Sequence, residues 1–131
     1  MKKLKIVIAC DSDDIIKSKG HFGDADLYQF FDLTIDGAIL NKSMPKLEIN
    51  QEKHIKGGDP LKAGAMKSFL AGNDVLVARQ FGQNMKRMLD DFVCIIIRKD
   101  SVDEALEILK NNFNSILEHK NKETRKHLLL G

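Results

Sequence analysis

A histidine lies in a short turn framed by two glycines, Gly20-His21-Phe22-Gly23. Glycine adopts positive φ readily and lets the backbone come close to a bound group. An imidazole can ligate soft or borderline metal ions, and it can also carry a proton. We therefore take His21 as the first candidate ligand. Its alternative role is that of a loop residue that caps a backbone carbonyl.

Two cysteines and a second histidine are further candidate ligands. Cys10 ends the apolar run KIVIAC, where a thiolate would suit an iron–sulfur species or another soft metal, although a small buried residue is the alternative. Cys94 lies within the run FVCIII and is expected in the core. His54, in the polar loop 43–58, is either a second imidazole or an exposed loop residue. Two cysteines are too few for a disulfide scaffold or for a four-cysteine zinc site within one chain.

Two glycine-containing segments precede predicted helices and could face an anion. They are Gly57-Gly58-Asp59-Pro60 and Phe81-Gly82-Gln83-Asn84. Free backbone N–H groups at a helix start favour a negative ligand, and Arg79 adds a positive charge beside the second segment. Neither segment matches a phosphate-binding fingerprint. A generic anion, including an anionic metal cluster, and an ordinary helix start therefore both remain open.

Three aspartates, Asp11, Asp13 and Asp14, follow the first apolar run. They lack the spacing and the glycine of a calcium loop, which favours a solvated acidic turn. Asp11 alone could serve a divalent-metal hydrolase acting on nucleic acid or nucleotide, provided that further carboxylates converge on it. No Ser/His/Asp or Cys/His catalytic pattern stands out. We therefore expect a protein that is not an enzyme.

Apolar periodicity predicts the elements that must position these residues. Continuous apolar runs indicate strands buried on both faces, and the Asp36-Gly37 pair indicates a hairpin turn. The expected strands are 5–10, 27–35, 38–42, 74–78 and 92–97. Helices are expected after Asp59 as N-cap, over 82–91, and from the capping box of Ser101 and Glu104 to about residue 119.

The element order βββαβαβα predicts a three-layer α/β fold. A hairpin needs antiparallel neighbours, and strand–helix–strand units need parallel crossovers. We therefore expect a five-stranded mixed sheet in the order 3-2-1-4-5, with helices on both faces. The chain reverses direction beside strand 1, and open α/β sheets bind ligands beyond the carboxyl ends of their strands at such a point. This predicts a crevice at the ends of strands 1 and 4, near Cys10 and residues 78–84.

The length of the sequence and its charge distribution indicate the number of domains and the classes of partner that the protein could bind. The 131 residues suit one domain, expected at 1–118 and followed by a basic C-terminal tail at 119–131. Residues 118–131 alone account for the net charge of +2. With one Tyr, no Trp and no basic face, nucleic-acid binding is not expected. No apolar stretch approaches the ~20 residues of a membrane span, so we expect a cytoplasmic protein without membrane contact.

Three segments resemble the dinitrogenase iron–molybdenum cofactor biosynthesis family: KIVIACD at 5–11, HFGDA at 21–25 and FGQN at 81–84. The resemblance covers roughly residues 4–110. It implies one domain with a ribonuclease H-like fold that carries or stores iron–sulfur cofactor precursors without catalysis. It also implies that His21 is the best-matched ligand and that Phe22 and Gly23 shape its turn.

The loop after the fourth expected strand departs from the family's commoner form, approximately G-G-[IF]-G-P-N. Gly82 and Asn84 are kept, whereas Gln83 replaces the proline. Ala78 and Arg79 replace the small pair, and Arg79 would compensate by pairing with an anionic ligand or would signal a different ligand.

These features together predict a small non-catalytic carrier of an anionic iron–sulfur cluster or iron–molybdenum cofactor precursor. The expected binding residues are His21, Phe22, Gly23, Arg79, Gly82 and Asn84, with His21 and Cys10 on the metal. One histidine and one cysteine are too few for four ligands, so transient holding or ligands from a second subunit are expected. The expected partner is a cofactor-assembly or acceptor protein. Two other hypotheses stay open: the divalent-metal hydrolase, and an interaction module that docks through the basic tail.

Overall fold

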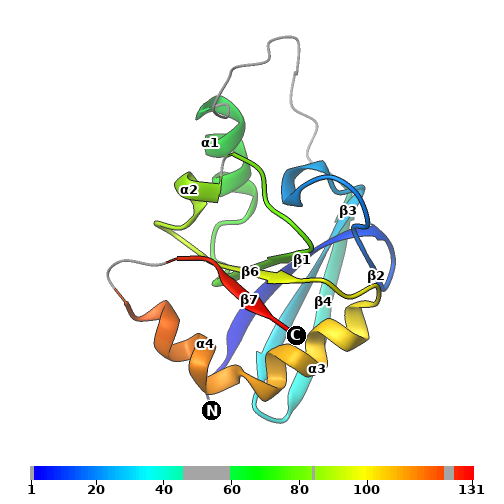
Figure 1. Ribbon diagram of the computed structural model, residues 1–131, viewed down its shortest axis with the longest axis vertical. Helices are drawn as coiled ribbons and strands as arrows, with labels where there is room; N and C mark the ends of the chain where they lie inside the picture. The colour runs from blue at the N-terminus through cyan, green and yellow to red at the C-terminus, as the bar shows by residue number, and fades with distance from the viewer. Residues whose placement is uncertain (1, 46–59, 84, 123–125) are drawn as a thin grey trace.

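The computed structural model describes residues 2–45, 60–83, 85–122 and 126–131, and it shows a mixed α/β fold around one central sheet (Figure 1). Seven strands form this sheet in the order β4-β3-β1-β5-β6-β7, with β2 paired to β1. The strands are β1 (Leu4–Ser12), β2 (Ile15–Ile16), β3 (Leu27–Thr34), β4 (Gly37–Pro45), β5 (Val75–Ala78), β6 (Val93–Ile97) and β7 (Leu128–Leu130). β3 pairs antiparallel with β1, and β4 pairs antiparallel with β3. On the other side of β1, the strands β5, β6 and β7 follow in parallel.

The predicted count of five strands is wrong, because β2 and β7 were not expected. β2 has only two residues and pairs with β1 across an irregularity between Cys10 and Ser12. β7 comes from the segment predicted as a basic tail, and it pairs in parallel with β6 from Ile95 to Ile97. The remaining strands lie in the order β4-β3-β1-β5-β6, which is the order expected for the five.

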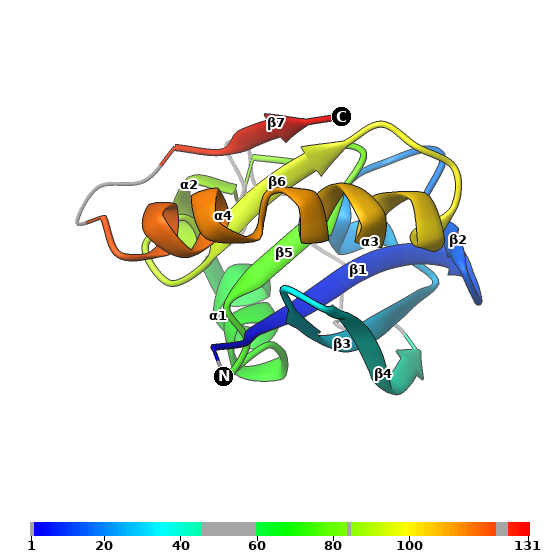
Figure 2. The same ribbon diagram turned by 90° about the horizontal axis from the view of Figure 1, so that it is seen from below.

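Helices cover both faces of the sheet, so the molecule has three layers (Figure 2). They are α1 (Pro60–Phe69), α2 (Met85–Met88), α3 (Val102–Asn111) and α4 (Phe113–Lys120), with a short 3-10 helix, η1 (Phe22–Asp24). Apolar residues of β1 alternate between two core clusters. Ile6 and Ile8 pack with α3 and α4, and Val7 and Ala9 pack with α1 and α2. The unbroken apolar run of β1 is therefore buried on both faces, as a central strand requires.

The single long helix predicted from Ser101 is in fact two helices, because the helical conformation is interrupted at Asn112. The start of α3 is as predicted: Ser101 Oγ accepts from the Glu104 N–H at 3.1 Å. Asn112 has φ −111° and ψ 15°, which is outside the helical region. Its side-chain amide donates to the Ile108 carbonyl at 2.8 Å and competes with the backbone ladder. The apolar stripe nevertheless continues through the buried Phe113 and Ile116 of α4.

The C-terminal segment packs against the domain. His119, at the end of α4, is only 8% exposed, and its Nε2 donates to the Lys126 carbonyl at 2.8 Å. This hydrogen bond ties the chain just before β7 to α4. β7 then lies at one edge of the sheet, with Leu129 61% exposed. None of the helices in the described ranges is long and apolar enough to cross a membrane.

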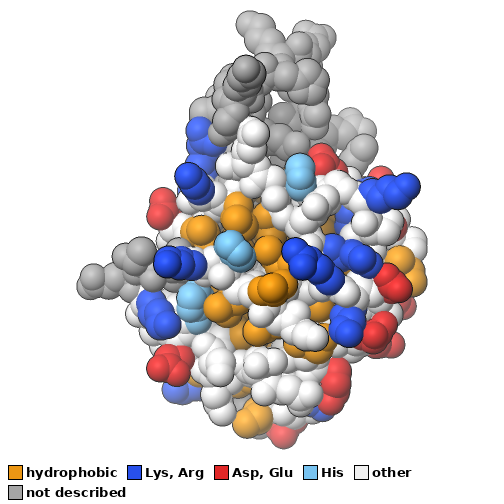
Figure 3. Space-filling view, viewed as in Figure 1, with side chains coloured by type: hydrophobic (Ala, Val, Ile, Leu, Met, Phe, Trp, Pro, Cys, Tyr) orange, Lys and Arg blue, Asp and Glu red, His pale blue; other side chains and the backbone are white. Residues whose placement is uncertain are grey.

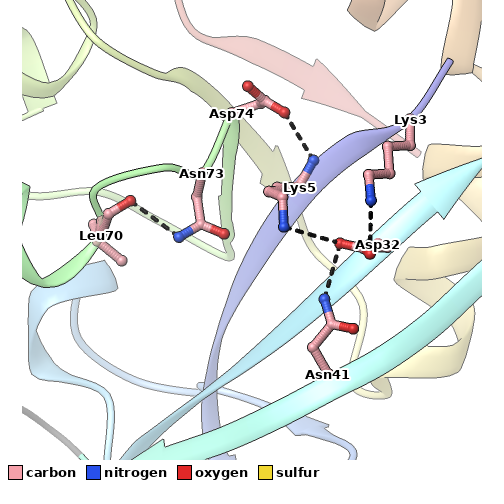
Figure 4. Close-up of polar contacts among 7 residues, drawn as sticks. All are labelled: Lys3, Lys5, Asp32, Asn41, Leu70, Asn73 and Asp74. Carbon is pink, nitrogen blue, oxygen red and sulfur yellow. Dashed lines mark hydrogen bonds and ion pairs between the residues drawn. The ribbon is translucent and has the colours of Figure 1, made fainter.

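Polar contacts fasten the strands where β1 begins, at the end of the sheet opposite η1 (Figure 4). Asp32 forms ion pairs with Lys3 at 3.4 Å and Lys5 at 3.6 Å, and it accepts from the Asn41 amide at 2.8 Å. These contacts, led by the Asn41 hydrogen bond, hold the pKa of Asp32 below its ordinary value. Asp74 accepts from the Lys5 backbone N–H at 2.9 Å, which links β1 to the turn before β5.

Candidate functional site

Two loops far apart in sequence meet beyond β1 and β5. The Phe22 N–H donates to the Gln80 carbonyl at 3.0 Å, which joins η1 to the loop that follows β5. The rings of Phe22 and Phe81 stack across the same junction, with centroids 5.5 Å apart and planes 11° from parallel. Tyr28 of β3 donates its hydroxyl to the Phe22 carbonyl at 2.8 Å. The histidine turn is therefore held from the β5 side and from β3.

His21 lies directly against Gly82. A β-carbon at position 82 would lie 3.0 Å from His21 Nδ1 and 3.2 Å from Cγ, closer than side chains normally pack. The His21 side chain is about half exposed, at 51%. Only glycine at position 82 leaves room for the imidazole in this position, so two residues predicted from separate motifs are in contact.

The turn before η1 fixes the backbone of His21. The Asp24 carboxylate accepts from the His21 N–H at 3.0 Å, and its Oδ2 lies 3.7 Å from His21 Nδ1. Gly20 adopts φ +87°, which L side chains rarely tolerate, so glycine is needed at this position. The imidazole thus extends from a backbone that is held in place, although the ring itself stays accessible to solvent.

An open pocket with a cavity volume of about 40 Å³ adjoins this contact. Its lining is mostly apolar and consists of Phe22, Gly23, Met66, Phe81, Gly82, Met85 and Met88. Phe22, Gly23 and Gly82 were predicted as site residues, and the structure brings them together with His21. The face seen in Figure 3 has an apolar centre with Lys and Arg side chains around it.

Sequence reasoning did not assign Met66, Met85 and Met88 to the site. Met85 and Met88 lie in the segment 82–91, where a helix was expected, and their spacing of three residues puts them on one side of it. The helix is shorter than predicted, because α2 spans only Met85–Met88 and the chain turns at residues 89–91. The spacing of the two methionines was a usable signal, but nothing in it indicated a cavity.

Arg79 does not face this pocket as an unpaired charge. Its guanidinium forms an ion pair of 2.6 Å with Asp100 in the loop before α3. The pocket lies beside α1 and α2, in the other core cluster. An anionic ligand that paired with Arg79 would therefore have to compete with the Asp100 carboxylate of the same chain. Asn84, His54 and residues 57–59 lie outside the described residues.

Cys10 is not brought to His21. Its side chain is fully buried in the cluster that packs on α3 and α4, whereas Phe22 belongs to the cluster of α1 and α2. The Sγ donates to the Ile8 carbonyl at 3.4 Å. Burial raises the pKa of the Cys10 thiol to about 12, which disfavours the thiolate that binds metals. The burial of Cys10 therefore weighs against the prediction that it binds a metal together with His21. Cys94 is buried in the core, as expected.

Asp11, near the end of β1, is engaged by side chains of the loop that follows this strand. Asp11 Oδ2 accepts from the Ser18 hydroxyl at 2.7 Å and from the Ser18 N–H at 3.0 Å, and Oδ1 pairs with Lys17 at 3.1 Å. These contacts, with the Ser18 hydroxyl first, lower the pKa of Asp11. Within the described ranges, no group of three or more His, Cys, Asp or Glu side chains could hold a metal ion.

Comparison with known proteins gives one family. A family model described as dinitrogenase iron-molybdenum cofactor matches residues 4–112, a span that runs from β1 to the break after α3 and contains both loops of the site. Among curated proteins, none matches the chain.

Proposed function

We propose that this chain, which belongs to the dinitrogenase iron-molybdenum cofactor family, is a non-catalytic carrier of a metallocluster. The cargo is an anionic iron–sulfur cluster or an iron–molybdenum cofactor precursor, held at His21 beside the apolar pocket. The observation that carries this proposal is the packing of a half-exposed imidazole against Gly82, at the edge of that pocket.

The chemistry of the residues supports a cluster as cargo. Imidazole is a ligand for iron and other borderline metals. The pocket beside it offers two aromatic rings and three thioethers, which are soft and polarizable and suit the sulfide face of a cluster.

A single protein ligand suits a carrier that must release its cargo. Structural iron–sulfur sites use four protein ligands, and such a set would retain the cluster. His21 is the one described imidazole at this junction, and Cys10 is buried elsewhere. We therefore propose transient holding, followed by transfer to an assembly or acceptor protein that completes the ligand set. The two reduced cysteines agree with a reducing compartment, and we place the carrier in the cytoplasm.

The contacts of Asp11 weigh against the divalent-metal hydrolase. Its oxygens are used by Ser18 and Lys17, and a hydrolase would need them on a metal with other carboxylates. We therefore do not advance this alternative.

Anaerobic titration of the apoprotein with an iron–sulfur cofactor precursor tests the proposal. Visible absorption and bound iron should show saturable binding, and His21→Ala should abolish most of it while the thermal unfolding midpoint stays near that of the wild type. His127→Ala is the matched control, because His127 is exposed and lies just before β7. Equal cluster retention by His21→Ala and by the control would refute the role of His21. Absence of binding by the wild type would refute the carrier proposal itself.

A further inference from the structure

The pocket beside His21 contains a concentration of thioether sulfur that suits a single metal ion as well as a cluster. Three of its lining residues are methionines: Met66 from α1, and Met85 and Met88 from α2. The whole sequence has five methionines, so most of them line this one space. Met66 and Met88 are nearly fully buried, at 4% and 5% exposure, whereas Met85 is partly exposed.

We propose that this pocket binds a single soft monovalent metal ion of the Cu(I) class through the three methionine sulfurs, with His21 as a nitrogen donor at its edge. This site goes beyond the proposed function, because its ligand is a cation rather than an anionic cluster. It does not require that a cluster bind.

Donor chemistry selects this class of metal. Thioethers are soft ligands that select Cu(I) over the hard cations, which prefer oxygen, and imidazole also ligates copper. Thioethers and a neutral imidazole carry no charge, so they compensate a single positive charge more readily than a double one. The Asp24 carboxylate, 3.7 Å from His21 Nδ1, adds negative charge beside the imidazole.

Local structure brings the three methionines to the lining of one pocket. Met85 and Met88 are three residues apart on α2, so their side chains share one face of the helix. The Met85 N–H donates to the Gly82 carbonyl at 3.1 Å, which fixes the start of α2 next to the residue that contacts His21. Met66 reaches the same pocket from α1. The pocket is open to solvent on one side, so an ion has a route of entry.

Cu(I) itself is the probe, added under anaerobic conditions to protein whose methionine methyl groups are labelled with carbon-13. We expect the methyl signals of Met66, Met85 and Met88 to shift at one equivalent of Cu(I), and the signal of Met44 to stay. Met44 of β4 is the internal control, because it packs against the same core cluster but does not line the pocket. Cu(I) captured by the cysteines instead would leave the three methionine signals unmoved and would overturn the proposal.

Competition with a chromogenic Cu(I) chelator then measures affinity in Met85→Leu/Met88→Leu and in Met44→Leu. Leucine keeps the apolar volume and removes the sulfur, so the fold should survive. We expect the double variant to weaken Cu(I) binding by about tenfold or more and Met44→Leu to leave it unchanged, a tenfold change corresponding to about 1.4 kcal/mol. Equal Cu(I) affinity in the wild type, the double variant and Met44→Leu would overturn the proposal. Cluster uptake by the double variant is measured in parallel, so that failure of the copper site and failure of the carrier proposal give different results.

Discussion

Gly82→Ala perturbs the imidazole of His21 without removing it. The added methyl group would lie 3.0 Å from Nδ1, 3.2 Å from Cγ and 3.5 Å from Cβ of His21. Gly82 has no positive φ, so alanine suits its backbone. The strain therefore falls on the His21 side chain, which is half exposed and can rotate toward solvent.

The size of this displacement predicts the loss of binding. Relief of the contact from 3.0 Å to an ordinary separation of about 3.4 Å requires the ring to move by about 0.4 Å. Metal–ligand distances tolerate deviations of only ~0.2 Å, so this movement of the ring is larger than a metal–nitrogen bond accommodates. We expect cluster affinity to fall by about 10- to 100-fold, the range seen when groups that orient a metal ligand are disturbed. The free energy of unfolding should change by no more than ~0.5 kcal/mol, as for other exposed sites.

The assay compares cluster titration and urea denaturation in Gly82→Ala and Gly64→Ala. Gly64 of α1 is the matched control, since no described atom lies within 4 Å of a β-carbon there. The control should bind like the wild type, and it should gain up to ~1 kcal/mol of stability because alanine is the better helix former. Wild-type affinity in Gly82→Ala, together with a loss in His21→Ala, would show that the ring position does not matter and would refute the reasoning.

Two further predictions concern groups outside the pocket. Burial raises the pKa of the Cys10 thiol to about 12, so iodoacetamide should label it only after denaturation, as mass spectrometry of native and unfolded protein would show; rapid native labelling would contradict this assignment. Asn41→Ala removes the main contact that lowers the pKa of Asp32, so NMR titration should show that pKa rising toward its ordinary value. The lowered pKa stabilises the folded protein above the ordinary Asp pKa, and this contribution is lost as pH falls through the folded-state value. Asn41→Ala should therefore lower the urea midpoint at neutral pH and show a smaller difference in acid; an equal difference in both would argue against the linkage.

The part of the fold that the sequence predicts correctly consists of strands whose apolar runs allow a single interpretation. β1, β5 and β6 contain short continuous apolar runs rich in β-branched residues, and the pairing of β5 with β1 and with β6 follows from the connection rules. β7 was missed because three leucines after a basic segment carry no strand signal without β6 beside them. The break at Asn112 was missed because Leu109 and Phe113 continue one apolar stripe across it.

The predictable part of the site is the meeting of its two loops. The glycine-framed turn of His21 and the segment of Gly82 follow strands whose carboxyl ends share one edge, so their proximity follows from topology. The direction of Cys10 does not follow, because a strand buried on both faces gives no preference for either face. The ion-pair partner of Arg79 could not be predicted from a sequence pattern either, because Asp100 lies in a loop.

In the proposed carrier, the backbone hydrogen bond from Phe22 to Gln80 would couple cargo uptake to folding. Each half of the site is local in sequence, but the halves meet only after β1 and β5 pair in parallel at Ile8 and Val77. Such non-local pairing slows folding, because the entropy of closing the intervening chain must be overcome first. A ligand that needs both halves binds the native state alone, and at 100 times its dissociation constant it adds about 2.7 kcal/mol to the stability of that state. In the proposed carrier, loading would therefore depend on a complete fold. A chain that has not formed its sheet holds His21 without Gly82 beside it and would bind no cargo.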